Sequence, residues 1–353
     1  MSSTLNWPQI LGKLIAGEDL NRAEAAWSLD QIMSGETDPG LVSTFMLSLR
    51  HKGESVDELS GLVDAMLTNS LKLDTGNDAV DIVGTGGDLL GTVNISSMAS
   101  ILTASAGVPV LKHGSRSASG KTGSSEMLEK LGIRLDLDPE QVASVFAKTG
   151  ISFFFAPVFH PAMRFVAPIR KLLAVPTTFN FLGPLANPAQ PIATSLGVAN
   201  RQIAPLMASE LAARGRSALV FRGNDGLDEL STTTKNEIWQ VVRGEVSPSE
   251  LNPVKLGLKK AEISELIGGD AAHNAQVARD LFAGKTNGNL GAVRDIVILN
   301  AAGGVVSYEF AKDNSRADVD LELRFTDAIQ KVTTALESGA GEAKLTEWVA
   351  ATN

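Results

Sequence analysis

The feature that most constrains this chain is an alternation, beginning near Asp78, between short apolar runs and segments with helical spacing. The runs that have the composition of buried strands cover residues 79–83, 108–111, 151–155, 193–198 and 217–221. Because consecutive parallel strands need a long connection between them, usually a helix, this alternation predicts an α/β unit. We expect a mainly parallel central sheet flanked by helices.

The first 70 or so residues follow a different pattern, in which apolar side chains recur at helical spacing. Leu11, Leu14 and Ile15 form the first such set, and Asn21 with Glu24 has the spacing of a capping box at the start of the next helix. A chain of 353 residues, 44% of them hydrophobic, is long enough for two domains. We therefore expect a small all-helical N-terminal domain beside the larger α/β domain.

Charge and composition exclude several classes of protein. The net charge of -9 opposes a large favourable field toward a polyanion, so we expect no nucleic-acid partner. The absence of cysteine excludes disulfides, thiolate nucleophiles and cysteine-ligated metals. The first 20 residues contain Pro8, Lys13 and Glu18 and do not form an export signal, and no uncharged apolar run reaches the roughly 18 residues of a membrane span. We expect a cytoplasmic protein without a membrane partner.

A glycine-rich loop follows the first predicted strand. It reads Gly84-Thr85-Gly86-Gly87-Asp88, and residues 94–97 then open a helix. Glycines let backbone N–H groups approach phosphate oxygens closely, and a helix N-terminus adds positive charge. The loop is therefore a candidate phosphate cradle, although a tight strand-to-helix turn is an equally good interpretation of the glycines alone. It matches neither the dinucleotide nor the nucleoside-triphosphate motif.

A second loop, residues 112–125, brings together cations, hydroxyls and glycines after the second predicted strand. Lys112, Arg116 and Lys121 supply charge that neutralises phosphate, while the serine hydroxyls offer hydrogen bonds. The alternative is a solvated glycine-serine loop. Together with the first loop, this segment predicts a site for a phosphorylated ligand.

Two further segments carry candidate ligand groups. Asp228 and Glu229 follow the predicted strand at 217–221. Two adjacent carboxylates at a strand end either bind magnesium or belong to a solvated acidic turn. The apolar stretch 153–188 contains His160 and Arg170, whose polar groups face either water or a ligand carboxylate.

Taken in order, segments 84–88, 94–97, 112–125, 160–188 and 226–229 resemble the anthranilate phosphoribosyltransferase family of tryptophan biosynthesis, and the resemblance extends over nearly the whole chain. That family transfers the phosphoribosyl group of 5-phosphoribosyl 1-pyrophosphate (PRPP) to anthranilate. The resemblance implies PRPP binding by Gly84, Gly87, Asp88, Thr92, Asn94, Ile95, Ser96, Ser97, Lys112, His113, Gly114, Ser115, Arg116, Ser117, Ala118, Ser119, Gly120 and Ser124. It implies anthranilate binding by Gly84, His113, Ser115, His160, Arg170, Gly183 and Pro184.

The resemblance also implies Mg²⁺, as two ions, at Ser96, Asp228 and Glu229, and electrostatic catalysis by Lys112, Asp228 and Glu229 without an assigned acid or base. It implies a nucleoside phosphorylase/phosphoribosyltransferase-like fold and a homodimer. The helical domain is expected to be discontinuous, comprising residues 1–72 with 161–191, and the α/β domain then comprises 73–160 with 192–353.

Two residues depart from the family's usual pattern. Ser115 stands where the family usually has asparagine; it cannot offer the paired donor and acceptor of an amide, so we expect it to alter the affinity for anthranilate. Phe159 stands where tyrosine is common, which removes one hydroxyl and keeps the aromatic ring. Pyrimidine-nucleoside phosphorylases, which resemble this chain in fold and in the 112–125 segment, are the first alternative; residues 179–188 and 228–229 favour the phosphoribosyltransferases instead. A non-catalytic nucleic-acid-binding relative is the second alternative, and the acidic net charge opposes it.

Overall fold

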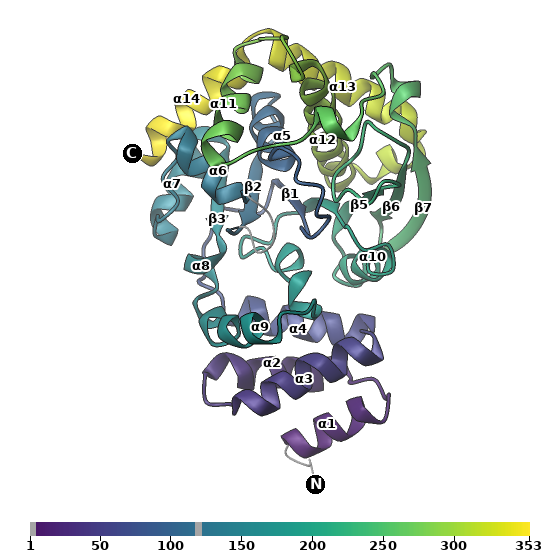
Figure 1. Ribbon diagram of the computed structural model, residues 1–353. Coiled ribbons are helices and arrows are strands. Elements are labelled where there is room, and N and C mark those ends of the chain that lie inside the picture. The colour runs from purple at the N-terminus through teal and green to yellow at the C-terminus, as the bar shows by residue number, and fades with distance from the viewer. Residues whose placement is uncertain (1–4, 117–121) are drawn as a thin grey trace. The chain divides into compact units, whose positions relative to one another are not determined.

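The computed structural model describes residues 5–116 and 122–353. The chain forms two compact units, one comprising residues 1–72 with 156–188 and the other 73–155 with 189–353 (Figure 1). The second segment of the helical unit therefore begins at Ala156 rather than at the expected residue 161, and it ends at Pro188 rather than at 191. The earlier start follows from the short helix after the third strand, where the Phe159 carbonyl accepts a hydrogen bond from the Leu71 N–H at 2.9 Å.

The helical unit is held by well-capped helices. Asn21 and Glu24 form the expected capping box, and Ser55 with Glu58 forms another. Glu58 is also buried, and its carboxylate accepts from the Leu20 N–H and from Lys52. The elements are α1 (Trp7–Ile15), α2 (Arg22–Ser34), α3 (Pro39–Lys52), α4 (Val56–Thr68), α8 (Ala156–Phe159), η1 (Pro161–Phe165), α9 (Ala167–Leu173), η2 (Thr178–Asn180) and η3 (Gly183–Leu185).

The α/β unit is built on a seven-stranded sheet with the order β3-β2-β1-β4-β5-β6-β7. The strands are β1 (Val80–Gly84), β2 (Val110–Gly114), β3 (Ile151–Phe155), β4 (Ala193–Gly197), β5 (Ser217–Gly223), β6 (Asn236–Val242) and β7 (Glu245–Leu251). The first five strands are parallel, as their buried apolar sequences predict. The antiparallel hairpin of β6 and β7 was not expected from the sequence, because β6 mixes buried and half-buried residues and β7 is largely exposed, so neither strand is a continuously buried apolar run.

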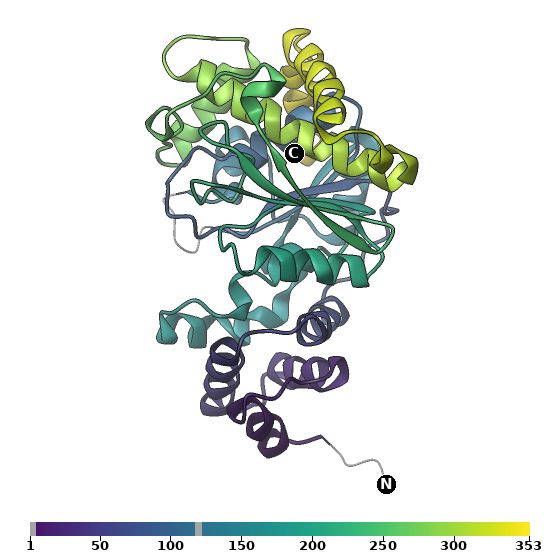
Figure 2. The same cartoon turned by 90° about the vertical axis from the view of Figure 1, so that its right-hand side faces the viewer.

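Strand order reverses between β1 and β4, and this determines where the helices lie. Right-handed connections place the helix after β1 and the helix after β4 on opposite faces of the sheet. Accordingly α5 (Ile95–Ser105) packs with α12 (Leu290–Lys312) on one face, and α10 (Ala204–Ala213) covers the other (Figures 1 and 2). In open α/β sheets, ligands bind beyond the carboxyl ends of the strands at such a reversal.

The remaining helices of this unit complete its outer layers. They are α6 (Ser124–Leu131), α7 (Pro139–Thr149), η4 (Pro253–Leu256), η5 (Ile263–Glu265), α11 (Ala271–Phe282), η6 (Asn314–Asp318), α13 (Leu321–Glu337) and α14 (Ala340–Thr352). Helix α12 is long and apolar enough to cross a membrane, but 78% of its most apolar window is buried inside the protein. Its contacts with β1, β4, β5 and α5 show that its hydrophobicity fills the core.

Candidate active site

The ends of β1 and β4 form the floor of the candidate site. Gly84 and Gly197 are the last residues of these strands and are paired in register. Both lie against Asp228: a Cβ on Gly84 would come within 2.4 Å of the Asp228 Oδ2, and one on Gly197 within 1.8 Å of its carbonyl oxygen. Only glycine fits at these two positions, so the Asp228 side chain lies against the Gly84 backbone and the Asp228 backbone lies against that of Gly197.

Two neighbouring carboxylates face this floor. Asp228 Oδ2 accepts a hydrogen bond from the Gly86 N–H at 2.6 Å, and Glu229 Oε1 accepts one from the Ser96 N–H at 3.0 Å. Burial, followed by the charges of Glu229 and Asp88, raises the pKa of Asp228 well above its ordinary value. Burial raises the pKa of Glu229 to about 7, although the charge of Lys112 opposes this shift. Burial therefore disfavours the ionised form of both carboxylates, and their mutual proximity adds to this effect at Asp228.

Lys112, expected to contribute to electrostatic catalysis, lies inside the protein. Its side chain is 2% exposed, and its Nζ donates to the Ile82 carbonyl and, at 3.4 Å, to the Ser96 hydroxyl. Burial lowers the pKa of Lys112, while the charges of Asp81, Glu229 and Asp228 raise it. Lys112 therefore acts as a counter-charge beneath the carboxylates.

The first turn of α5 presents hydrogen-bond donors beside the carboxylates. Its N-cap residue is Asn94, but the Asn94 side chain makes no capping bond to the helix. Within the described part of the chain, the Ser97 N–H has no acceptor and the buried Ser97 hydroxyl has no partner. This turn, with Gly87, Asp88 and the half-buried Thr92 in the preceding loop, retains free capacity to bind an anion.

The predicted second loop is only partly described. His113 is 3% exposed, and its backbone N–H donates to Asp81 at 3.1 Å. Arg116 is paired with Glu129 through two bonds of 3.0 and 3.1 Å. Gly114 lies against Ser124, whose hydroxyl donates to the Ser115 carbonyl at 3.4 Å. The predicted contacts at Ser117, Ala118, Ser119 and Gly120 lie outside the described residues.

The candidate anthranilate residues His160, Arg170, Gly183 and Pro184 belong to the helical unit. Arg170 is half-buried in α9, and burial lowers its pKa. No group among residues 5–116 and 122–353 pairs with its guanidinium, so it has capacity for a carboxylate ligand. His160 is 3% exposed and bonded through Nε2 to the Ala186 carbonyl at 3.0 Å, and burial lowers its pKa to about 4. It is neutral at physiological pH and packs within its own unit.

The donor set at the carboxylates fits magnesium. Asp228, Glu229 and the Ser96 hydroxyl are oxygen ligands, which hard cations prefer, and burial raises the pKa of both carboxyl groups, so a bound cation would favour their ionised form. In the described part of the chain, no three acidic or histidine side chains form a metal cluster. Such an incomplete set suits Mg²⁺, which usually keeps waters and binds substrate phosphates.

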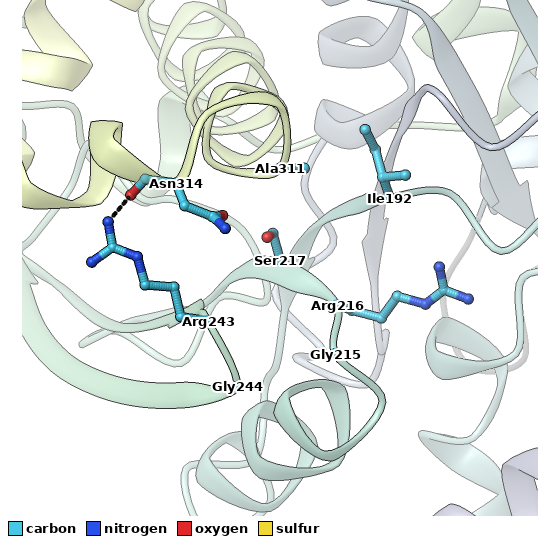
Figure 3. Close-up of a pocket in the computed structure, with 8 residues that line it drawn as sticks. All are labelled: Ile192, Gly215, Arg216, Ser217, Arg243, Gly244, Ala311 and Asn314. Carbon is cyan, nitrogen blue, oxygen red and sulfur yellow. Dashed lines mark hydrogen bonds between the residues drawn. The ribbon is translucent and has the colours of Figure 1, made fainter.

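A cavity of about 400 Å³ lies elsewhere in the α/β unit, at the amino ends of β4 and β5 (Figure 3). Arg216 and Arg243 line it, but their guanidinium groups extend away from one another. Arg216 is bonded to Gln190, and Arg243 is paired with Asp318. The cavity lies at the opposite end of the strands from Gly84 and Gly197 and has no part in the candidate site.

Sequence reasoning did not identify two residues that shape this site: Gly197 and Asn274. The position of Gly197 at the end of an apolar run was a usable signal, because the equivalent glycine after the first run was noticed. Asn274, which hydrogen bonds to Asn94 at 2.8 Å, has no local signal.

Comparison with known proteins assigns both units to one family. The α/β domain model of the Glycosyl transferase family matches residues 76–342, and its helical bundle domain model matches residues 8–70. A full-length relative, the anthranilate phosphoribosyltransferase of Leifsonia xyli, is 51% identical over 352 residues and covers 100% of each chain.

Solved structures agree. The anthranilate phosphoribosyltransferase of Thermus thermophilus is 36% identical, with a TM-score of 0.88 and coverage of 97% of this chain and 99% of that one. The enzyme of Saccharomyces cerevisiae is 25% identical. Its complex with PRPP and Mg has a TM-score of 0.86, covering 98% of this chain and 97% of that one. Its complex with 4-fluoroanthranilate has a TM-score of 0.84 and covers 98% of both chains.

Proposed function

Because this chain belongs to the anthranilate phosphoribosyltransferase family, we propose that the cluster at the ends of β1 and β4 carries out that family's reaction. The enzyme transfers the phosphoribosyl group of PRPP to anthranilate in tryptophan biosynthesis, giving N-(5-phosphoribosyl)anthranilate and pyrophosphate. The observation that supports this site most strongly is the placement of Asp228 and Glu229 beside unused donors of α5 at the strand-order reversal.

The glycine loop and the first turn of α5 bind the phosphate groups of PRPP. Backbone N–H groups of the loop and the Ser97 N–H donate to phosphate oxygens, and the helix N-terminus favours their negative charge. Asp228, Glu229 and Ser96 would hold Mg²⁺, which we assign as two ions and which would supply positive charge beside the pyrophosphate. Lys112 limits the repulsion between the carboxylates from below.

The acceptor amine needs positioning more than activation. As the bond to pyrophosphate lengthens, the ribose gains oxocarbenium character, and the amine of anthranilate already carries a lone pair at neutral pH. Arg170 binds the anthranilate carboxylate, because its guanidinium is half-buried and lacks a partner in the described chain. We also assign Ser115 to the binding of anthranilate, the acceptor. His160, neutral and bonded to Ala186, supports the fold of its unit and is not assigned as a base.

The test follows anthranilate fluorescence after addition of PRPP, with and without Mg²⁺. The purified protein should consume anthranilate only when the metal is present. The double variant Asp228→Asn/Glu229→Gln should lose this activity, whereas Asp318→Asn, which removes a surface carboxylate paired with Arg243, should keep it. Full turnover in the double variant would remove the carboxylates from the mechanism. Phosphorolysis of thymidine or uridine instead of anthranilate consumption would favour the nucleoside phosphorylase alternative.

We also propose that the protein is a homodimer in the cytoplasm. The helical unit exposes apolar side chains, among them Ile15 at 71% and Leu47 at 41%, which are suited to pairing with a second copy. Light scattering of the purified protein should give twice the chain mass of 37.1 kDa. A monomeric mass at micromolar concentration would contradict the dimer.

A further inference from the structure

Two asparagine side chains form a relay that links the start of α11 to both loops of the candidate site. The Gly269 N–H donates to Asn274 Oδ1 at 2.8 Å, and Asn274 Nδ2 donates to Asn94 Oδ1 at 2.8 Å. Asn94 Nδ2 in turn donates to the Thr122 carbonyl at 3.2 Å. Asn94 and Asn274 are 180 residues apart in the sequence, and Asn274 is 1% exposed.

The backbone determines the direction of this relay at both ends. A backbone N–H can only donate, so Asn274 must turn its oxygen toward Gly269; a carbonyl can only accept, so Asn94 must turn its nitrogen toward Thr122. The two remaining amide groups then face each other as donor and acceptor. No other orientation of either amide satisfies all three bonds, and the relay therefore has a single hydrogen-bonded arrangement.

Backbone contacts hold the relay in place. The Val93 N–H donates to the Leu266 carbonyl and the Gly268 N–H to the Gly91 carbonyl, each at 2.9 Å. A Cβ on Gly268 would come within 2.8 Å of Asn274 Oδ1 and 2.9 Å of the Thr92 carbonyl, so the close approach requires glycine. The segment before α11 therefore lies along the loop that leads into α5.

The relay changes what Asn94 does at the start of α5. An N-cap asparagine ordinarily accepts a hydrogen bond from the second or third N–H of its helix, here that of Ser96 or Ser97. Asn94 makes no such bond, because its amide is turned toward Asn274 and Thr122 and away from these N–H groups. The Ser96 N–H is used by Glu229, and the Ser97 N–H has no acceptor within the described residues. A donor that the helix would normally use internally is left open.

We propose that Asn274 is a positioning residue for PRPP binding: by holding the Asn94 side chain away from the helix cap, it keeps the first turn of α5 open for a phosphate group. Asn274 itself contacts no substrate. Without it, the Asn94 amide is free to rotate onto the Ser97 N–H and compete with the ligand for that donor. This inference rests on the proposed function, because it assumes that PRPP is the anion bound there.

The test compares Asn274→Ala and Asn274→Asp with the unaltered protein. Asp keeps the acceptor for Gly269 but loses the donor for Asn94, so it separates the two links of the relay. We expect both variants to raise the KM for PRPP and its dissociation constant by calorimetry about tenfold, the value of one hydrogen bond to a charged group. The kcat at saturating PRPP and the KM for anthranilate should change less than about twofold, because Asn274 touches neither the reacting atoms nor the acceptor.

Thr149→Val is the matched control. Thr149 is also buried, and its hydroxyl forms hydrogen bonds with the backbone of Val145 and Ile151 at the amino end of β3, the end opposite the candidate site. This variant should lower the melting temperature and leave the KM for PRPP unchanged. If the Asn274 variants behave like Thr149→Val, or if kcat and both KM values change together, Asn274 is a structural residue and the inference is wrong. If Asn274→Ala does not fold, Asn274→Asp and Asn274→Ser provide the same comparison. Failure of the unaltered protein to bind PRPP would instead overturn the proposed function.

Discussion

Magnesium binding by this protein is expected to depend on pH near neutrality. Glu229 is a proposed ligand whose pKa burial raises to about 7 in the metal-free protein. The metal requires the ionised carboxylate, so below this pKa it must displace a proton. Replacing Glu229 by Gln removes the titratable carboxyl group and keeps a side chain of similar size.

The size of the effect follows from this pKa. A carboxyl with a pKa of about 7 is roughly 10% ionised at pH 6 and roughly 90% at pH 8. We therefore expect magnesium to bind about tenfold more weakly at pH 6 than at pH 8, a difference of about 1.4 kcal/mol in binding free energy.

The raised pKa of Glu229 also affects the stability of the fold. The native state holds the proton between the ordinary value of 4.5 and about 7, so the free energy of unfolding of the metal-free protein should fall as pH rises through that window.

Isothermal calorimetry measures both the magnesium affinity and the number of protons released. Magnesium is titrated into the protein with PRPP at pH 6, 7 and 8, in two buffers with different ionisation heats, so that released protons are counted directly. Titration of PRPP itself contributes equally to the Glu229→Gln variant, and the difference between the two proteins isolates Glu229. Equal pH dependence in both proteins, or a magnesium affinity that is constant from pH 6 to 8, would refute the assigned protonation of Glu229.

Three other substitutions test separate parts of the structure. Arg170→Ala should weaken anthranilate binding by about 1.5–3 kcal/mol in calorimetry and leave PRPP binding unchanged, and equal loss for both ligands would contradict its assignment to the acceptor. Gly197→Ala should displace the Asp228 loop, because its Cβ would lie 1.8 Å from the Asp228 carbonyl oxygen. We expect the free energy of unfolding in urea to fall by about 1–3 kcal/mol and the activity to fall as well. Full activity would show that the sheet end and the loop are farther apart. Leu89 has a φ of 59° and is 79% exposed, so Leu89→Asn should gain about 1 kcal/mol in the same unfolding assay, and unchanged stability would argue against a left-handed backbone there.

Local chemistry in the sequence determined much of the fold. The capping box of Asn21 and Glu24 depends on residues three positions apart, and the five parallel strands are marked by short apolar runs that only a sheet covered on both faces can bury. The glycine loop and the acidic pair were found the same way, since each lies directly after a strand. The chain order of these segments was sufficient for the resemblance to the phosphoribosyltransferases.

Tertiary structure decided the features that depend on distant segments meeting. Lys112 lies in a cation-rich segment whose composition is typical of a surface loop, yet its amino group is buried because β2 is an interior strand. No periodicity or spacing in the sequence predicts the approach of Gly197 to Asp228 or the hydrogen bond between Asn94 and Asn274. A sequence pattern reports the environment of a residue averaged over its own helix or strand, whereas a hydrogen bond across 180 residues depends on how two such elements pack.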